Sequence, residues 1–545
     1  MRGKTLICLV VSFEMCNFAP MKCMSTQLFW HLLAIGELCF APSVAKAAID
    51  SDDTEGIDYS LSTQMSASVG RHTPLWLNAN KYGLSSLSKA NGYMRATVEL
   101  PSSADRNRKW DVGFGIDIAQ AFHYTSSTVV QQAFVEVRYL KGRLTLGSKE
   151  EPMELKNQRL SSGSQTLGIN SRPVPSLRLA LEDYWNVPGT KGWVSIKGHI
   201  AYGMTTDDGW QKDVTQMKSR YTEDTFLHTK AGYVKIGNEE QYFPFSVEAG
   251  LEMGAQVAGN AYWPMSDGTM RKIENDKSLT AFLQAFVPGG GETTETTYRN
   301  ATGNIVGSWV MRLNADYDTW NLGVYADHYF EDHSSMLFLD YDGYGTGAEW
   351  NERVKSRYTL YDLRDIMLGT ELKLKDARYV NNIVVEYLYT KYQSGPLYHD
   401  HTQMMPDHVS GLDNYYNHHL YTGWQHWGQV IGNPLYLSPI YNNDGLIEVE
   451  CNRFVAYHLG ISGAPTDRFN YRFLASWQKG YGTFRKPYPN PKENFSAMFE
   501  ANIFLGNHWH LCAAAAIDRG ALRGNNSGLQ LTLVNKGLLN KKQKR

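Results

Sequence analysis

The sequence has 545 residues, of which 42% are hydrophobic and 20% charged, and its formal net charge is -2 at pH 7. So balanced a charge excludes a basic surface for nucleic acid, and the composition stays even, with no long linker between domains. The mean hydropathy is -0.40, and beyond residue 48 no window has the ~18 uninterrupted apolar residues of a membrane-spanning helix. A membrane barrel is still allowed, because its strands carry an apolar side chain only at every second position.

Residues 1–47 are interpreted as a signal region. Met21 begins a segment with an apolar stretch over residues 28–40 and a small-residue cleavage motif that ends at Ala47. We expect translation to start at Met21 and residues 48–58 to form a flexible N-terminus.

Alternation of apolar and polar residues begins directly after this region. It is complete over residues 59–69, matching the ~9 to 11 residues of a tilted membrane strand. Residues 71–88 have no steady period and are predicted to form an ordered loop or short helix. Alternation returns near residue 92, and further on Val112 and Ile116 oppose Asp117. We therefore expect lipid on one face of these strands and the barrel lumen on the other.

Breaks in the alternation separate the remaining strands. Between 148 and 192 it lapses at residues 172–175 and 187–189, so this stretch is interpreted as a segment that crosses or lines the interior. The connectors 207–225 and 288–303 are long and polar and are expected to be extracellular loops. Further strands are predicted at 193–203, 230–236, 245–257, 309–317, 320–330, 367–375, 382–389, 471–477, 497–505, 509–517 and 529–534.

The predicted fold class is all-β, a transmembrane antiparallel β-barrel of about eighteen strands with lumen-filling loops or short helices. The barrel is expected over residues 59–535, followed by a basic C-terminal tail at 536–545. Closure of the sheet removes exposed edge strands that would otherwise aggregate. Leu251 is expected toward lipid and Glu252 toward the lumen, so Arg should cost about 2–4 kcal/mol at the first position and far less at the second.

The most distinctive stretch is residues 415–461. Its first part, up to Gly445, is rich in aromatic residues, and its glycines and prolines exclude a helix or a central strand, so it is interpreted as an ordered, infolded loop. Its second part alternates from Leu446 onward, with Val449 on the apolar side and Glu448 on the polar side. It is predicted to be one long strand whose polar face lines the lumen.

Two of these runs, residues 324–350 and 415–445, resemble hallmark segments of the capsule assembly Wzi family of outer-membrane proteins, in the form carried by Gram-negative anaerobes. Shorter pieces are similar in order along the chain: QQAFVEVRY at Gln131, GINSRPVPSLRL at Gly168, EYLYTKYQSGP at Glu386 and NRFVAYHLGISG at Asn452. The resemblance implies an eighteen-stranded barrel in the cell outer membrane that attaches or orders capsular polysaccharide as a lectin-like protein.

The partners expected on this basis are capsular or exopolysaccharide, outer-membrane lipid and the barrel insertion machinery, for a monomer with no cofactor. A diffusion porin or polysaccharide passage channel is the main alternative, because eighteen strands make a barrel wide enough for a channel. Residues 152–190 and 415–445 are interpreted as lumen filling, so little conductance is expected.

Sugar recognition needs aromatic faces for the pyranose ring, with amides, carboxylates or histidines for its hydroxyls. The candidate polysaccharide-binding residues are Tyr421, Trp424, His426, Trp427, Asn433, Glu331 and Asp332. The aromatic members could equally form a packing cluster, and the two acids could cap a strand end or pair with arginines. Both alternatives stay open at this point.

No catalytic or metal site is predicted. Residues 331–335 hold Glu, Asp, His and Ser, but neighbours on a strand point to opposite faces, which argues against a hydrolase site. The acidic turn at Asp340 and Asp342 lacks the bidentate Glu of a calcium loop, and no CxxC or His/Cys cluster suggests zinc. Cys451 and Cys512 could pair in an oxidising periplasm, but they are interpreted as small hydrophobic strand residues.

Overall fold

In a computed structural model of the chain, the structure describes residues 56–102, 109–238, 241–286, 303–331, 342–344, 347–349, 351–355, 365–398 and 409–539. The predicted signal region, most of the connector 288–303, and the acidic residues Asp332 and Asp340 lie outside the described residues. All described residues lie in one compact unit, Glu55–Arg545.

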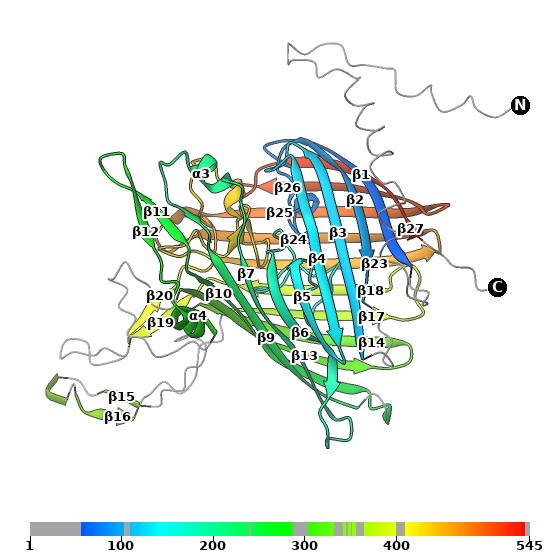
Figure 1. The fold of residues 1–545 in the computed structure, drawn as a ribbon, viewed down its shortest axis with the longest axis horizontal. Helices are drawn as coiled ribbons and strands as arrows, with labels where there is room; N and C mark the ends of the chain where they lie inside the picture. Colours follow the sequence, from blue (N-terminus) through cyan, green and yellow to red (C-terminus); the bar gives the residue numbers. More distant parts are fainter. Residues whose placement is uncertain are drawn as a thin grey trace, which may run out of the picture. The chain divides into compact units, whose positions relative to one another are not determined.

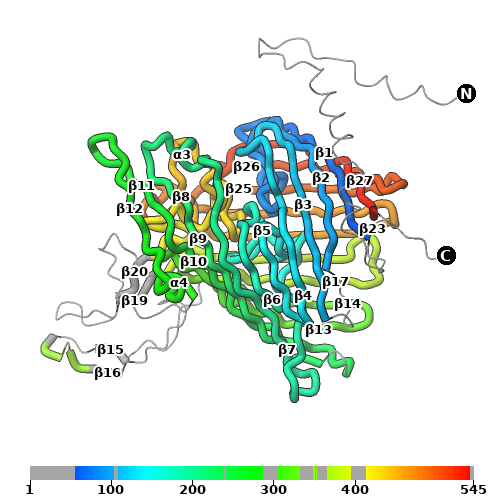
Figure 2. The backbone as a smooth tube through the Cα atoms, viewed as in Figure 1, coloured from blue at the N-terminus to red at the C-terminus, as the bar shows by residue number. Residues whose placement is uncertain are grey.

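Eighteen antiparallel strands form one sheet that closes on itself (Figures 1 and 2), which confirms the predicted fold class. Each strand pairs with the next one along the sheet, and the first strand closes the barrel against the last, from Ile57 opposite Leu539 to Val69 opposite Ser527. The strands are β1 Ile57–Val69, β2 Ala90–Leu100, β3 Trp110–Phe122, β4 Thr128–Tyr139, β5 Gly142–Ser148, β6 Ser176–Asn186, β7 Val194–Met204, β9 Phe226–Ile236, β10 Phe245–Val257, β13 Asn304–Asp316, β14 Trp320–Glu331, β17 Ile366–Leu374, β18 Asn382–Tyr389, β23 Phe454–Thr466, β24 Phe469–Gly482, β25 Pro487–Gly506, β26 Trp509–Gly520 and β27 Asn526–Leu539.

Smaller elements occupy the connections between barrel strands. The helices are α2 Leu75–Asn78, α3 Trp210–Thr215 and α4 Leu279–Phe286, with 3-10 turns η4 Gly347–Glu349 and η5 Pro439–Tyr441. The minor strands are β8 Tyr221–Glu223, β11 Asn260–Pro264, β12 Met270–Glu274, β15 Asp342–Tyr344, β16 Arg353–Lys355, β19 Ser394–Tyr398, β20 Val409–Leu412, β21 Gln425–His426 and β22 Gln429–Val430. No helix in the described part of the chain is long and apolar enough to span a membrane.

The barrel wall is apolar outside and polar inside, because successive side chains of a strand point to opposite faces. On β3, the outward residues Val112 and Ile116 are each 53% exposed. Asp117, which follows Ile116 and points inward, is fully buried. The same alternation exposes Leu61 and Met65 on β1. The predicted outward and inward faces of these strands are therefore confirmed.

The two ends of the barrel differ in the length of their connections. At one end, residues 140–141 and 507–508 are two-residue turns between neighbouring strands. Long connections, among them 149–175, 205–225 and 390–453, lie at the opposite end. We call these the short-turn end and the long-loop end. In outer-membrane barrels, short turns face the periplasm and long loops face the cell exterior.

Three described segments, 70–89, 149–175 and 413–453, fold into the barrel interior, and we call them the plug segments. Side chains from all three, such as Trp76, Leu160 and Trp424, share one hydrophobic cluster with inward residues of the wall. The lumen-filling loops and short helix expected from the sequence are thus present.

Carboxylates on the inner wall hold the backbone of the plug segments. Because an infolded loop has no strand partner, its N–H groups need other acceptors. The acceptors are Glu386 for the N–H of Ser162 at 2.8 Å, Asp327 for Gln165 at 3.0 Å, Asp518 for Leu75 at 3.2 Å, and Glu331 for Tyr416. Charge-assisted bonds of this kind are stronger than neutral ones, so they fix the position of the plug in the wall.

The long strand predicted from Leu446 is wrong in its first half, because β23 begins only at Phe454. Val449 is buried at 1% exposure, and both its N–H and its carbonyl oxygen bond to the side chain of Asn417 rather than to a neighbouring strand. Residues 446–453 are therefore an extended part of the plug. Glu448 lies outside any strand and pairs with Lys486, so it does not line a lumen face.

One barrel strand was missed, and several strand boundaries differ from those predicted, with β25 and β27 among them. β6 lies within the stretch 148–192, where no strand was expected, because it starts directly after Pro175 and a register shift between Leu181 and Trp185 obscures its alternation. β25 begins at Pro487, ten residues before the predicted start, and β27 continues to Leu539.

Glu252 is not on an open lumen wall. Its side chain is fully buried and accepts hydrogen bonds from the hydroxyls of Tyr233 at 2.9 Å and Ser164 at 3.2 Å. An arginine at this position would lose both bonds in a packed interior. The small loss of stability that the sequence predicted for Glu252→Arg is therefore no longer expected.

Candidate functional site

A small polar pocket lies at the long-loop end, where the plug segment 413–453 meets the connection 205–225. Its lining combines hydroxyl, amide, carboxylate, imidazole and indole groups. The lining residues are Thr205, Thr206, Asp207, Gln211, Thr222, Thr225, Gln256, Thr422, Gln425, His426 and Trp427. This polar pocket is the candidate site, and it includes two of the residues singled out from the sequence.

A two-residue hairpin presents Trp427 at the pocket. Strands β21 and β22 pair, and between them Trp427 and Gly428 have φ of 54° and 77°. Positive φ at both central residues is the signature of a type I′ turn. A side chain at Gly428 would lie 2.4 Å from the ring of Trp210, so glycine is required there for packing as well. The indole of Trp427 is partly exposed, and the guanidinium carbon of Arg172 lies 4.1 Å from its ring centroid.

His426 ties this hairpin to the neighbouring segments. Its Nδ1 lies 2.8 Å from the carbonyl oxygen of Arg172, and its Nε2 lies 3.1 Å from the backbone nitrogen of Thr206. Burial lowers the pKa of His426 to about 4, so the imidazole is neutral at physiological pH. Both ring nitrogens are engaged, and the residue positions the pocket wall.

A connected set of amides and hydroxyls forms the rest of the wall. The Oε1 of Gln211 accepts hydrogen bonds from the hydroxyls of Thr422 at 2.9 Å and Thr222 at 3.3 Å, and Gln425 donates to Thr422 at 3.1 Å. The buried hydroxyl of Thr225 has no hydrogen-bond partner within the described residues. A buried polar group of this kind is normally satisfied by water or a ligand.

The pocket is shallow. Its accessible volume of about 10 Å³ is close to the minimum that holds one water molecule, far below the volume of a sugar ring. A glycan would therefore lie across the mouth against Trp427, with at most one hydroxyl entering the polar pocket.

Apart from Asp332, which lies outside the described residues, the remaining predicted residues are part of the packed interior. Trp424 is fully buried, its Nε1 donates to the carbonyl oxygen of Thr166 at 2.9 Å, and its ring rests against Gly254 of β10. Tyr421 is 2% exposed, and its hydroxyl donates to a carbonyl oxygen at 3.3 Å. Both rings are buried, that of Trp424 within the hydrophobic cluster of the plug, and they offer no face to a sugar in solution in this arrangement.

The predicted amide and acid have bonding roles in the plug. The Nδ2 of Asn433 donates to the carbonyl oxygen of Gly163 at 2.9 Å, and its Oδ1 accepts the N–H of Leu435 at 3.0 Å. Glu331 accepts the hydroxyl of Tyr329 at 2.8 Å in addition to the plug N–H described above.

The sequence argument missed the residues that come from the connection 205–225 and from the end of the plug segment 149–175. Gln211, Thr222 and Arg172 each precede Trp427 by more than 200 positions. No local sequence pattern links them to the hairpin. The available signal was Gly428, since glycine adopts the positive φ that a two-residue hairpin turn requires.

Within the described ranges, no group of three or more His, Cys, Asp or Glu side chains could hold a metal ion. Cys451 and Cys512 are both free, Cys451 buried in the interior and Cys512 on β26.

Comparison with protein-family models gave no match, and no curated protein matches the chain. Among solved structures, the chain is similar to Wzi of Escherichia coli, described as a carbohydrate binding β-barrel involved in group 1 capsule assembly, with 12% identity, a TM-score of 0.50, and coverage of 91% of this chain and 87% of Wzi. OprD of Pseudomonas aeruginosa has 8% identity and a TM-score of 0.41 over 89% of this chain and 95% of OprD. Identities this low speak for the fold alone, and that fold is the outer-membrane β-barrel.

Proposed function

We propose that this protein resides in the cell outer membrane, belongs to the Wzi family of capsule assembly proteins, and binds capsular or related surface polysaccharide without covalent chemistry. The observation that carries this proposal is the polar pocket at the long-loop end, with the partly exposed ring of Trp427 at its mouth. An aromatic face beside hydroxyls and amides is the combination that carbohydrate recognition needs. The similarity of the barrel to a carbohydrate-binding one supports it.

A filled barrel suits retention better than passage. The plug segments occupy the interior with buried aromatic and aliphatic side chains, and wall carboxylates fix their backbone. Planar bilayer recordings of the purified protein should therefore show no large, steady single-channel currents. Such currents would favour the porin or passage-channel alternative.

A single weak binding site per protein is enough to retain a repeating polymer at the cell surface. Stacking of a sugar on one indole contributes about 1 kcal/mol, roughly a fivefold change in affinity per site. A polysaccharide chain presents the same unit many times and meets many copies of the protein, so these weak contacts add up to retention.

Trp427→Ala should lower binding of the purified protein to the host's surface polysaccharide and should reduce glycan retention when it complements a deletion strain. Thr225→Val keeps the side-chain volume and removes the unpartnered hydroxyl, so a smaller loss is expected. Trp185→Ala is the matched control, because that tryptophan is 39% exposed on β6 near the short-turn end.

Folding of each variant is checked by heat-modifiable gel mobility before binding is compared. A folded Trp427→Ala protein with normal binding would clear this residue, and a deletion strain with fully retained polysaccharide would refute the function.

A further inference from the structure

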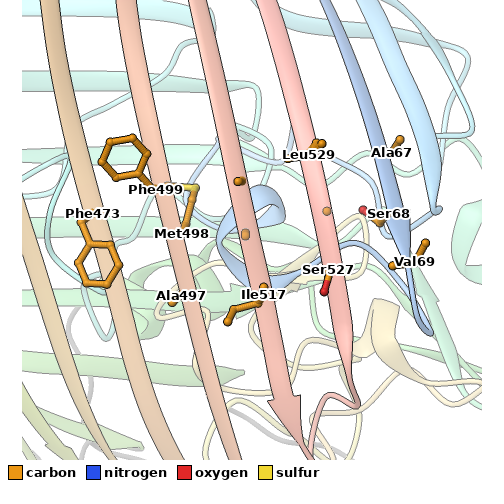
Figure 3. A pocket seen from close by; sticks show the side chains of 13 residues that line it. Ala67, Ser68, Val69, Phe473, Ala497, Met498, Phe499, Ile517, Ser527 and Leu529 are labelled. Carbon is orange, nitrogen blue, oxygen red and sulfur yellow. The ribbon is translucent and has the colours of Figure 1, made fainter.

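A groove runs along the outer face of the barrel at the seam where β27 meets β1 (Figure 3). Its volume is about 610 Å³, within the range of small-molecule sites. Its lining comes from β24, β25, β26, β27 and β1 and is almost entirely apolar. We call it the seam groove, and Figure 3 shows Phe473, Phe499, Ile517 and Leu529 along it.

The groove follows from the order of small and large side chains in adjacent strands. On the outer face, Ala497 of β25 lies opposite Ile517 of β26, and Ala515 of β26 lies between Phe499 of β25 and Leu529 of β27. Each alanine leaves a hollow that its larger neighbours flank. On a surface that faces lipid, such a hollow is filled by hydrocarbon.

Two arginines stand at the long-loop end of the seam groove. Arg519 is exposed two residues beyond Ile517 on the same face of β26, and its guanidinium donates to the carbonyl oxygen of Asn526 at 2.7 Å and the hydroxyl of Ser527 at 3.1 Å. Arg71 is exposed just after β1, and its backbone N–H donates to the Oδ1 of Asn526 at 2.8 Å. Both arginines therefore contact Asn526, Arg71 through its backbone N–H and Arg519 through its guanidinium.

Neither arginine has an acidic partner in an ion pair within the described part of the chain. The nearest carboxylate along β26, Asp518, is fully buried and points into the barrel. The end of the apolar groove therefore carries two exposed cationic side chains, while Glu493 on the adjacent strand β25 is already paired with Lys479 at 2.9 Å. This charge complements a phosphate group, which arginine binds well because its guanidinium presents several N–H donors in one plane.

We propose that the seam groove binds an acyl chain of a phosphorylated lipid of the outer leaflet, with the lipid phosphate held by Arg71 and Arg519. The inference rests on the outer-membrane setting of the proposed function, which places the long-loop end at the cell exterior, and it does not depend on glycan binding. Lipid without an exposed phosphate monoester would fill the groove less tightly, because it leaves the arginine pair without a partner.

The test is lipid binding by the full chain, folded in zwitterionic detergent micelles and measured by native mass spectrometry. The probes are bis-phosphorylated lipid A, the same lipid A after enzymatic removal of its phosphates, and phosphatidylethanolamine. We expect one lipid A adduct per chain, with an affinity roughly 30-fold above that of the dephosphorylated lipid, from two arginines at the membrane surface. Equal affinity for the three lipids would overturn the proposal, and so would a dimer mass that excludes lipid.

Two pairs of variants locate the site. Arg71→Gln with Arg519→Gln should remove the preference for lipid A, whereas Arg378→Gln with Arg468→Gln, both exposed at short-turn connections, should keep it. Ala497→Trp should weaken binding of all three lipids by filling the groove, whereas Ala249→Trp, exposed on the outer face of β10, should not.

All variants must show normal heat-modifiable mobility. The comparison of lipid A with dephosphorylated lipid A uses the unmodified protein, so it does not depend on the folding of any variant. Unchanged lipid A preference in the folded double arginine variant would also overturn the site. Because polysaccharide binding is measured with Trp427→Ala, failure of one proposal leaves the other standing.

Discussion

Trp424 and Trp427 are three positions apart, yet they occupy opposite environments. The ring of Trp424 is fully buried against β10, whereas that of Trp427 is partly exposed at the tip of the β21–β22 hairpin. The sequence predicted one aromatic cluster with a shared role. The type I′ turn divides it, because Trp427 lies at the tip of the hairpin whereas Trp424 precedes the hairpin and packs inside.

Trp424→Ala should therefore destabilise the protein, while Trp427→Ala should leave stability almost unchanged. Removing a fully buried tryptophan leaves a cavity and an unpaired Thr166 carbonyl oxygen, at a cost of about 3–5 kcal/mol. Urea unfolding in detergent micelles, followed by heat-modifiable mobility, measures the difference. Equal unfolding midpoints for the two variants would contradict this assignment.

Acid should weaken the plug through His426. Burial lowers the pKa of this residue from 6.5 to about 4, so below pH 6.5 the unfolded chain takes up a proton that the folded chain does not. Stability is therefore constant above this range and falls as pH drops from about 6.5 to 4, by about 2 kcal/mol at pH 5. Urea midpoints at pH 7.5 and pH 5 should differ less in His426→Gln than in the parent protein. An identical difference in the two proteins would exclude this histidine as the source of the acid sensitivity.

At the scale of elements, the plug segments are bound to the wall by buried polar contacts. The Nζ of Lys156 pairs with Asp327 of β14 at 2.8 Å, and both side chains are almost completely buried. A buried ion pair gives little net stability compared with apolar residues, but the loss of one partner leaves an isolated buried charge.

Lys156→Met should cost about 3–5 kcal/mol, because it leaves the Asp327 carboxylate without its cation. Lys375→Met is the control: Lys375 pairs with Asp316 at 2.7 Å on the exposed short-turn side, and its loss should cost about 0–1 kcal/mol. The double variant Lys156→Met with Asp327→Asn should recover part of the loss. No recovery would mean that the lysine acts through packing rather than through charge.

The barrel strands could be predicted from the sequence because a wall with one lipid face imposes strict alternation. The plug could be predicted only as an interruption of that pattern. Residues 446–453 alternate like a strand, but their apolar side faces the interior core instead of lipid, and their backbone bonds go to side chains such as Asn417. Which acceptor a backbone group finds depends on tertiary contacts, and alternation carries no information about them.

For the whole molecule, the apolar outer wall predicts a depth-dependent response to charge. Ile116, at the middle of β3, and Val112, near its end, are both 53% exposed on the outer face. In a lipid bilayer, Ile116→Arg should cost about 2–4 kcal/mol and Val112→Arg about 0–1 kcal/mol. Unfolding of the two variants from liposomes measures both free-energy costs. Equal costs would contradict a bilayer whose midplane lies near Ile116.

The polar pocket itself is a property of the whole molecule. Its wall combines residues 205–207 after β7, Gln256 at the end of β10 and the hairpin at 425–427. The sequence supplied the aromatic component, because tryptophan beside glycine stands out locally. It could not supply the threonines and glutamines, whose contribution depends on three chain segments that are far apart in the sequence and meet only in the folded barrel.

Leu75, just after the first barrel strand, bonds through its N–H to Asp518 on the next-to-last strand, 443 residues further along the chain. The first plug segment, 70–89, lies between β1 and β2, but the acceptor for its Leu75 N–H lies on β26. The earliest plug segment therefore waits for nearly the entire chain to be delivered before its wall partner exists. During that interval the apolar residues around Trp76 lack their final packing, and we expect a periplasmic chaperone to shield them until the last strands arrive.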